Sequence, residues 1–333
     1  MLKFLNILAL FLLGVVIAGF SIWGSFALLY QGSDSEPLNI TIVCAFTLIS
    51  FLTLGSLFSI EWRLKALSLY VITFTSLLLW YSTILPSNNR MWQKDVAVLP
   101  YATQEGNLIS MHNIRNATYR SELDYDISYY DKTFDVQKLI GVDIVAVYWM
   151  GPSVAHIFLS FEFVGDEHLA ISIETRKEMG EIYTTLEGFF RQYELYYVVA
   201  DERDVIALRT NYRKDPVEDV YIYPATGTQE EAQELFLAYI EKINSLKKTP
   251  EFYNTLTTNC TTSIWKSTHK FLEDLSFSWK ILVSGYLPEY LYENKRLNTQ
   301  DKSFIELEKS VHINERANRI ESLENFSQKI REK

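Results

Sequence analysis

The first ninety residues contain three long apolar stretches that lack Asp, Glu, Lys and Arg. These stretches are residues 4–33, 37–60 and 66–89. Each exceeds the roughly 20 residues that an α-helix needs to cross the hydrocarbon core of a bilayer. The first stretch is long and two others follow it closely, which argues against a cleaved signal peptide. The pattern predicts a membrane anchor over residues 1–90, with transmembrane helices at about 4–30, 38–60 and 66–86.

Basic residues predict how this anchor is oriented. Lys3 precedes the first span, and Arg63 and Lys65 lie between the second and third spans, whereas the loop at 31–36 has no basic residue. Because basic residues are retained in the cytoplasm, the N-terminus and the second loop are predicted to be cytoplasmic. Three crossings then place residues from 91 onward outside. In a bacterium this is a multi-pass inner-membrane protein with a periplasmic domain.

The remaining pattern predicts an α+β domain over residues 91–304. Short runs rich in β-branched and aromatic residues, several with period-two alternation, are typical of strands. The expected strands are 96–98, 108–110, 143–149, 155–163, 168–174, 195–200, 205–210 and 220–223. Residues 121–138 are interpreted as a packed loop with a short helix, and 201–204 as a tight connection.

Two helices are predicted beside an antiparallel sheet. Thr228 and Glu231 form a capping-box pattern before an apolar helical stripe that extends to Leu246. A second helix begins near Cys260, and apolar residues at helical spacing continue to Leu275. Residues 305–333 have the pattern of a charged helical tail.

Charge and cysteine content narrow the function. Residues 91–333 contain 27 of the 31 Lys and Arg and 38 of the 41 Asp and Glu, giving a formal net charge of −11. This charge argues against nucleic acid as a partner. Of the two cysteines, Cys44 lies within the second predicted span, so an intramolecular disulfide with Cys260 is not expected. Cys260 is therefore unpaired in an oxidising compartment, where structural cysteines usually occur in pairs.

The surroundings of Cys260 favour a nucleophile. Thr258 and Asn259 are good N-cap residues. A thiol in the first turn of a helix is close to the positive end of the helix dipole, which favours the thiolate. The unpaired amides of the same turn can hold an oxyanion. Cys260 is predicted to be the catalytic nucleophile rather than a small buried side chain.

A catalytic cysteine needs a base and a group that orients the base. Among five histidines, His156 lies on a predicted strand at the edge of the core, and His269 is nearly three turns from Cys260 along its helix. We expect His156 to be the base. Glu174 or Ser172 on the next strand can accept its other ring proton, and Glu174 is preferred.

Other chemistries lack their sequence patterns. The chain has no Cys-x-x-Cys, no His-Glu-x-x-His, no glycine-rich phosphate loop and no Gly-x-Ser-x-Gly. Neither a metal site nor a cofactor is predicted.

Several stretches together resemble the periplasmic domain of the bacterial lipoprotein N-acyltransferase family called Lnb. The resemblance extends from about residue 110 to about 320 and does not include the three predicted spans. The stretches that carry it are 148–161, 169–178, 189–195, 198–204, 253–256 and 259–262.

This resemblance implies a circularly permuted papain-like, NlpC-type thiol acyltransferase, in which the histidine strand precedes the cysteine helix. The nucleophile falls on Cys260 and the base on His156. Asn259, Ser172 and Tyr253 are expected to bind substrate. The family's reaction would move an acyl chain from a membrane phospholipid, through a cysteine thioester, to the N-terminal amine of a diacylated lipoprotein.

Two alternatives remain on the sequence. A papain-like cysteine hydrolase, either a peptidase or a peptidoglycan amidase, would use the same cysteine and histidine. A non-catalytic membrane scaffold could also retain the fold. An apolar surface at the site would favour acyl transfer, whereas an acidic groove open to water would favour hydrolysis.

Overall fold

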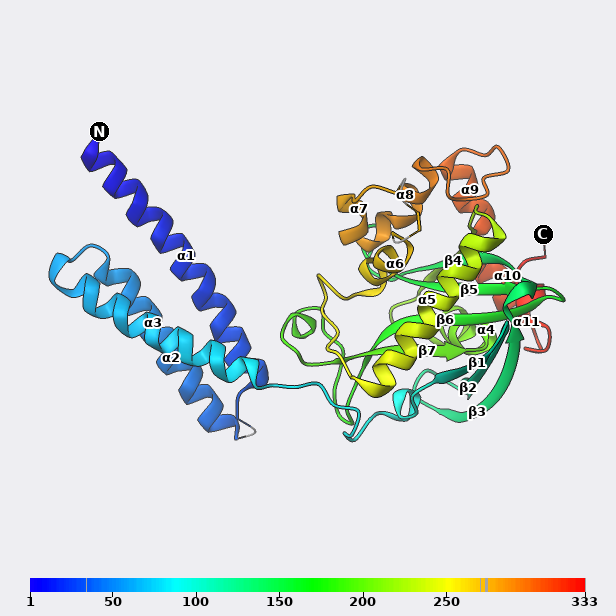
Figure 1. Cartoon of the computed structure of the whole chain (residues 1–333), viewed down its shortest axis with the longest axis horizontal. Coiled ribbons are helices and arrows are strands. Elements are labelled where there is room, and N and C mark those ends of the chain that lie inside the picture. Colours follow the sequence, from blue (N-terminus) through cyan, green and yellow to red (C-terminus); the bar gives the residue numbers. More distant parts are fainter. Residues whose placement is uncertain (34, 270, 273–274, 333) are drawn as a thin grey trace. The chain divides into compact units, whose positions relative to one another are not determined.

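The computed structural model describes residues 1–33, 35–269, 271–272 and 275–332 (Figure 1). The chain divides into two compact units. The helical unit comprises Met1–Pro86 and Thr184–Gln192, and the sheet domain comprises Ser87–Tyr183 and Tyr193–Lys333. Asp34 of the predicted first loop and Lys333 of the predicted tail lie outside the described residues.

The helical unit contains α1 (Leu2–Gln31), α2 (Glu36–Ser56) and α3 (Ile60–Ser82). Among the described residues, these three helices are long and apolar enough to cross a membrane. The third begins at Ile60 rather than at residue 66, so Arg63 and Lys65 belong to its first turns. Charged side chains are tolerated there because they can reach the interface from a helix end.

The later segment Thr184–Gln192 packs against the ends of these helices. Phe190 is buried, and its ring centroid lies 5.8 Å from that of Phe26. Arg191 Nη1 donates to the backbone oxygen of Tyr81 at 2.7 Å. This oxygen is one of the carbonyls at the end of α3 that have no partner within the helix, and a cation is favourable at that pole.

In the described part of the chain, the strands of the sheet domain form one sheet. Its eight strands run in the order β1-β2-β7-β6-β5-β4-β8, with β3 paired to β2. The pairs are antiparallel except for β2 with β7, so the sheet is mixed rather than wholly antiparallel as predicted. The strands are β1 (Tyr101–Glu105), β2 (Leu108–Tyr119), β3 (Tyr125–Asp135), β4 (Leu139–Tyr148), β5 (Ala155–Phe163), β6 (Glu167–Arg176), β7 (Glu194–Ala200) and β8 (Asp219–Pro224).

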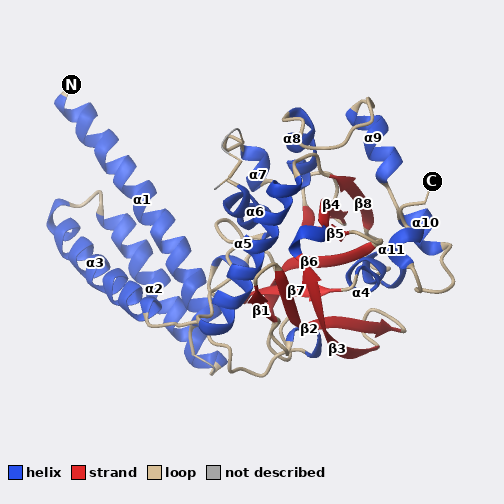
Figure 2. Cartoon of the chain, turned by 45° about the vertical axis from the view of Figure 1, so that its right-hand side comes forward, coloured by secondary structure: helices blue, strands red, loops and turns tan. Residues whose placement is uncertain are grey.

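Helices cover both faces of this sheet (Figure 2). The elements are η1 (Lys94–Val96), η2 (Val136–Lys138), α4 (Glu202–Ala207), η4 (Leu208–Tyr212), α5 (Gln229–Lys248), α6 (Cys260–Thr268), α7 (Trp279–Leu282), η5 (Ser284–Tyr286), α8 (Leu287–Glu293), α9 (Phe304–Val311), α10 (Asn314–Asn318) and α11 (Phe326–Lys329). The capping box predicted for Thr228 and Glu231 at the start of α5 is confirmed.

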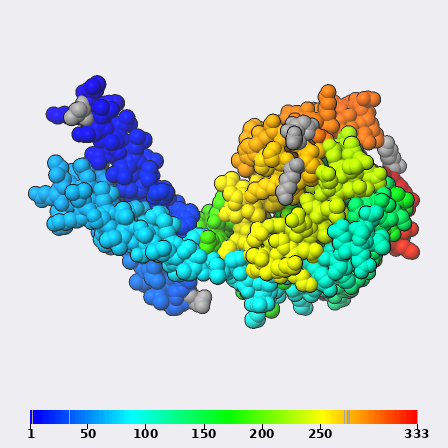
Figure 3. Space-filling view, in the orientation of Figure 1, coloured from blue at the N-terminus to red at the C-terminus, as the bar shows by residue number. Residues whose placement is uncertain are grey.

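Alternation along β5 divides the core into two layers. Ile157, Leu159 and Phe161 pack in one cluster with α5 and α6. Phe158 packs in the other cluster, with residues of α4, α10 and α11. In the space-filling view, the yellow-green side chains of α5 and the orange ones of α7 to α9 lie next to each other (Figure 3). Both faces of the central strands are therefore buried, as in sheets that are covered by helices on two sides.

The run 205–210 forms a helix and not the predicted strand. Its β-branched residues suggested a strand, but Asp201 is the N-cap of α4 and the run continues into η4. Fully buried Asp204 accepts from Arg115 Nε at 2.9 Å and from the backbone nitrogen of Ala117 at 2.8 Å. These long-range bonds stabilise a conformation that the local pattern does not reveal.

Three further predictions were wrong in part. The run 121–138 contains β3 rather than a loop with a short helix. Residues 96–98 are not a strand, because η1 ends at Val96. The helix at Cys260 ends at Thr268, before the last apolar residues of its predicted stripe. β3 escaped detection because it pairs with β2 alone, so acidic residues can occupy its exposed positions.

The predicted charged tail docks on the sheet domain through Arg331. Its Nη2 lies 2.6 Å from Asp143 Oδ2 and 2.6 Å from Glu202 Oε1, and both acids are buried. At Asp143, burial outweighs the charge of Arg331 and raises the pKa of the carboxyl. At Glu202, burial is outweighed by Arg331, which lowers the pKa of the carboxyl to about 2. The Glu202 ion pair therefore stabilises the fold above the usual glutamate pKa and is lost as the pH falls toward 2.

Replacing Arg331 should destabilise the sheet domain. Arg331→Met would leave two buried carboxylates without their cation, and breaking such a pair costs about 3 kcal/mol or more. Chemical denaturation at pH 7 measures the loss. The matched control is Arg319→Met, because Arg319 and its partner Glu315 are 77% and 83% exposed and such pairs contribute less than about 1 kcal/mol. Equal effects of the two substitutions would contradict the structural role of Arg331.

The orientation of the helical unit can be tested with a reporter. If Arg63 and Lys65 mark the cytoplasmic side, alkaline phosphatase fused after residue 95 should be active, because that enzyme requires an oxidising compartment. A fusion after residue 62 should be inactive. The opposite pattern would reject the predicted topology.

Candidate active site

Cys260 is the first residue of α6, and Asn259 is its N-cap, as predicted. Asn259 Oδ1 accepts from the Thr262 backbone nitrogen at 2.8 Å, and Asn259 Nδ2 donates to the Thr255 backbone oxygen at 2.7 Å. The Asn259 side chain therefore caps the N-terminus of α6. Its expected role in substrate binding stays a prediction. The Cys260 side chain is buried in the core cluster beneath α5, with the residue 7% exposed.

The pairing of β5 with β6 places His156 and Glu174 together. Leu159 pairs with Ile171 in an antiparallel register. Continuing that register toward the start of β5 puts His156 opposite Glu174. Ser172 lies two residues before Glu174 and shares its face of the sheet.

A compact hydrogen-bonded group results. His156 Nε2 lies 2.7 Å from Ser172 Oγ and 3.0 Å from Glu174 Oε1. Ser172 Oγ donates to the same Glu174 oxygen at 2.7 Å. Because Nε2 is committed to these two oxygens, Nδ1 is the ring nitrogen left for the hydrogen bond between His156 and Cys260. The structure thus brings together Cys260, His156, Ser172 and Glu174.

The electrostatics favour a protonated imidazole. Burial lowers the pKa of His156, but Glu174 and the hydrogen bond with Cys260 outweigh burial and raise it to about 9. Burial raises the pKa of Glu174, but His156 and Arg209 outweigh it and hold that carboxyl well below its usual range. The raised histidine pKa contributes stability that is fully present below the usual value and is lost as the pH rises through about 9. A cation next to a thiol favours the thiolate.

Arg209 is a site residue that the sequence reading missed. Its Nη2 lies 2.9 Å from Glu174 Oε1, and its side chain is 6% exposed. Its guanidinium also lies over the Phe158 ring, with 5.6 Å from Cζ to the centroid. The available signal was a single basic residue within the otherwise uncharged run 205–210, which was interpreted as a strand. Arg209 thus contacts the same carboxylate oxygen as His156, and its charge lowers the pKa of His156.

Tyr253 completes the surroundings of the thiol. It is buried, and burial followed by the proximity of Cys260 raises the pKa of its phenol well above the usual value. The phenol is therefore a neutral donor at every physiological pH. Its predicted role in binding substrate stays a prediction.

Exposed apolar side chains lie along the segments next to Cys260. Leu256 is in the turn before α6, and Trp279 and Leu282 are in α7. Thr261 Oγ1 joins α7 to the start of α6 by donating to the Ile281 backbone oxygen at 2.6 Å. The surface near Cys260 thus offers apolar contacts rather than a row of acids.

A second group of titratable side chains lies farther along the sheet, on the same face as His156 and Glu174 and next to α4. Ligand atoms of Asp143, His168 and Glu202 lie within 4.8 Å of one another. The guanidinium of Arg331 already supplies positive charge to both carboxylates. This group therefore has a structural explanation, and the absence of a metal site stays a prediction.

Comparison with known families agrees with the resemblance in part. Residues 125–285 match the model of the family described as the Lnb N-terminal periplasmic domain. This range contains His156, Ser172, Glu174 and Cys260. Comparisons with curated proteins and with solved structures gave no match.

The roles of these residues can be measured by the reactivity of Cys260. In a Cys44→Ser background, iodoacetamide labelling of Cys260 should be rapid at pH 7, because the pKa of His156 is raised to about 9 and the ring is a cation beside the sulfur. Glu174→Gln removes the main group that raises the pKa of His156 and leaves burial and Arg209, which lower it, so the ring should lose its proton and labelling at pH 7 should fall about tenfold. His156→Ala should cause a larger loss, and the double substitution should add nothing further.

Ser172→Ala is the matched control, because it removes a neutral partner of the same imidazole. It should change the labelling rate less than Glu174→Gln. A pH profile that is unaltered by Glu174→Gln but altered by Ser172→Ala would assign the orienting role to Ser172.

Proposed function

We propose that the chain is a membrane-anchored thiol acyltransferase whose sheet domain acts on lipid substrates in the periplasm. The observation that carries this proposal is the group of Cys260, His156 and Glu174 at the start of α6. The match of residues 125–285 to the Lnb domain and the membrane-length helices support it.

In the first half-reaction, Cys260 Sγ attacks the carbonyl carbon of a phospholipid ester. The carbon–oxygen bond breaks, the alcohol of the lysophospholipid leaves, and His156 gives its proton to that oxygen. The product on the enzyme is a thioester. In this proposal, backbone amides in the first turn of α6 stabilise the oxyanion that forms on the way.

In the second half-reaction, an amine attacks the thioester carbonyl. The acceptor that the resemblance implies is the α-amine of a diacylated lipoprotein. Now neutral, His156 removes a proton from the attacking nitrogen while the carbon–sulfur bond breaks, which restores the thiolate and the imidazolium. Glu174 stabilises the charged ring in both halves, and Arg209 keeps Glu174 ionised.

The order of the elements supports a permuted papain-like, NlpC-type layout. The strand β5, which carries His156, precedes the helix α6, which carries Cys260. An antiparallel neighbour, β6, supplies the third polar group. The hydrolase alternative would use the same residues with water as the acceptor. The apolar side chains beside α6 favour a lipid substrate instead.

Incubation of a diacylated lipoprotein with the enzyme and phospholipid should increase the lipoprotein mass by one acyl chain. Intact-mass spectrometry should also detect a hydroxylamine-sensitive acyl adduct on the enzyme. Cys260→Ala should abolish both signals, because the other thiol of the chain, Cys44, belongs to α2 and not to the group that contains His156. Cys44→Ser should retain both and serves as the control. Acyl transfer by Cys260→Ala would contradict the mechanism. Release of free fatty acid without a lipoprotein product would favour the hydrolase.

A further inference from the structure

A cavity of about 140 Å³ lies within the sheet domain between the sheet and the helices α5, α6 and α8. Protein interiors are close-packed, and voids larger than a water molecule are few. A cavity of this size is comparable to one that can hold a small hydrocarbon. An apolar space of this size next to α6, the helix that begins at Cys260, is therefore a candidate binding site.

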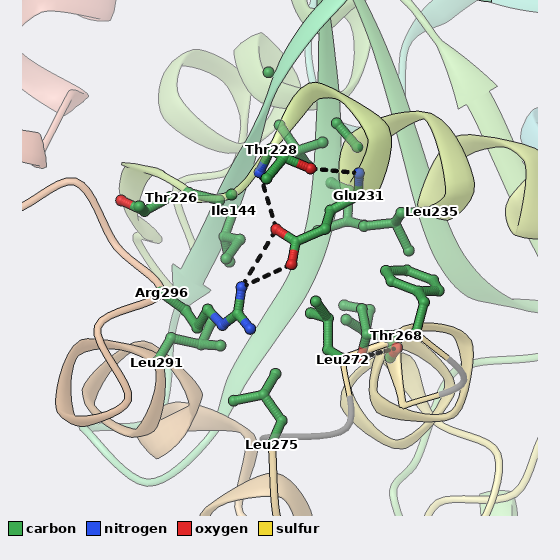
Figure 4. Close-up of a pocket in the computed structure, with 18 of the residues that line it drawn as sticks. Ile144, Thr226, Thr228, Glu231, Leu235, Thr268, Leu272, Leu275, Leu291 and Arg296 are labelled. Carbon is green, nitrogen blue, oxygen red and sulfur yellow. Dashed lines mark hydrogen bonds and ion pairs between the residues drawn. The ribbon is translucent and has the colours of Figure 1, made fainter.

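The lining of the cavity is largely apolar. Ile144 comes from the sheet, Leu235 from α5, Ile264 from α6 and Leu291 from α8. Leu272 and Leu275 follow α6 and point into the same space (Figure 4).

Several polar side chains in the lining already have partners for hydrogen bonds or ion pairs within the protein. The Arg296 guanidinium points to Glu231, with Nη1 3.2 Å from Oε1 (Figure 4). Thr268 Oγ1 donates to the Ile264 backbone oxygen at 3.1 Å. The Tyr290 hydroxyl donates to the Ser276 backbone oxygen at 2.6 Å. A ligand that needs many hydrogen bonds would find these groups occupied, whereas a hydrocarbon chain needs none.

The cavity lies along the same stripe of α6 as the nucleophile. Residues four apart on a helix lie one above the other, so Cys260, Ile264 and Thr268 share one face. Ile264 and Thr268 line the cavity. Eight residues of helix span about 12 Å, so the lining begins one turn from Cys260 and extends along the helix.

We propose that this cavity holds a segment of the hydrocarbon chain that Cys260 carries as its thioester. The proposal rests on the proposed function and deepens it, because it assigns a binding site for one unbranched acyl chain. The chain would leave the carbonyl at Cys260 and run along the α6 stripe toward Leu272.

The test measures how chain length affects labelling of Cys260. Alkyl methanethiosulfonates transfer their S-alkyl group to a thiolate and release methanesulfinate, so a series from methyl to dodecyl reports the site without needing turnover. The full chain, with Cys44→Ser, is used in lipid nanodiscs. The ratio of the octyl to the methyl labelling rate should be higher in the wild type than in a variant whose cavity is filled. Each methylene that is buried in the cavity should raise the rate by up to about fourfold.

Leu272→Trp fills the cavity from a partly buried position. It should lower the ratio of octyl to methyl labelling about tenfold, equivalent to excluding roughly two methylenes, while the methyl rate stays unchanged. Leu272→Ala should move the optimum to longer reagents. The matched control is Leu108→Trp on β2, outside the cavity lining, which should leave the ratio unchanged. Because all variants share the same lipid, partitioning of the reagents cancels.

An unchanged ratio in Leu272→Trp, with normal methyl labelling, would overturn the cavity assignment and leave the nucleophile intact. If methyl labelling of Cys260 fails in the wild type, the proposed function falls and the cavity assignment falls with it. If Leu272→Trp misfolds and loses methyl labelling, the cavity assignment is tested by the length optimum of Leu272→Ala instead. An unchanged length optimum in that variant overturns the assignment.

Discussion

The antiparallel register of β5 and β6 controls what the candidate site can be. Leu159 pairs with Ile171, and this register brings His156 opposite Glu174. A slip of one residue would turn every side chain of one strand to the other face of the sheet. Because both faces of these strands are buried, such a slip would also place polar groups among the apolar residues of the α5 layer. The same hydrophobic alternation that builds the core therefore fixes the position of His156 and Glu174 in the candidate site.

Burial of charge on the face opposite α5 is the second constraint. Glu174 lies between His156 and Arg209, and Asp204 accepts from Arg115. An isolated buried charge is very costly, and a hydrogen-bonded partner offsets part of that cost. At the site, Glu174 raises the pKa of His156 whereas Arg209 lowers it. The two side chains thus set the protonation state of the ring by opposing effects.

Much of this arrangement could be predicted from the sequence. Hydrophobic length predicts the three membrane helices, and period-two alternation predicts β5 with its bounds. The N-cap chemistry of Asn259 predicts the start of α6. These features are local, since each depends on a neighbouring residue or a simple period. The proximity of His156 to Glu174 could also be predicted, because the two residues lie on consecutive strands that form a hairpin.

The missed features depend on distant partners. Val205 and Ile206 have strand propensity, yet they form a helix because Asp204 within that helix binds Arg115 on β2. Arg209 follows on the same element and reaches Glu174 only through that fold.

The proposed second half-reaction would explain why a membrane anchor matters to the chemistry. A thioester that reacts with water gives a hydrolase, and one that reacts with an amine gives a transferase, so the difference lies in which nucleophile arrives first. Cys260 is 7% exposed, which limits the access of water. Confinement of enzyme and acceptor to one membrane raises the effective concentration of the amine in the way that a linker does. A buried thiol and a shared bilayer would therefore act in the same direction, each favouring transfer over hydrolysis for the same catalytic group.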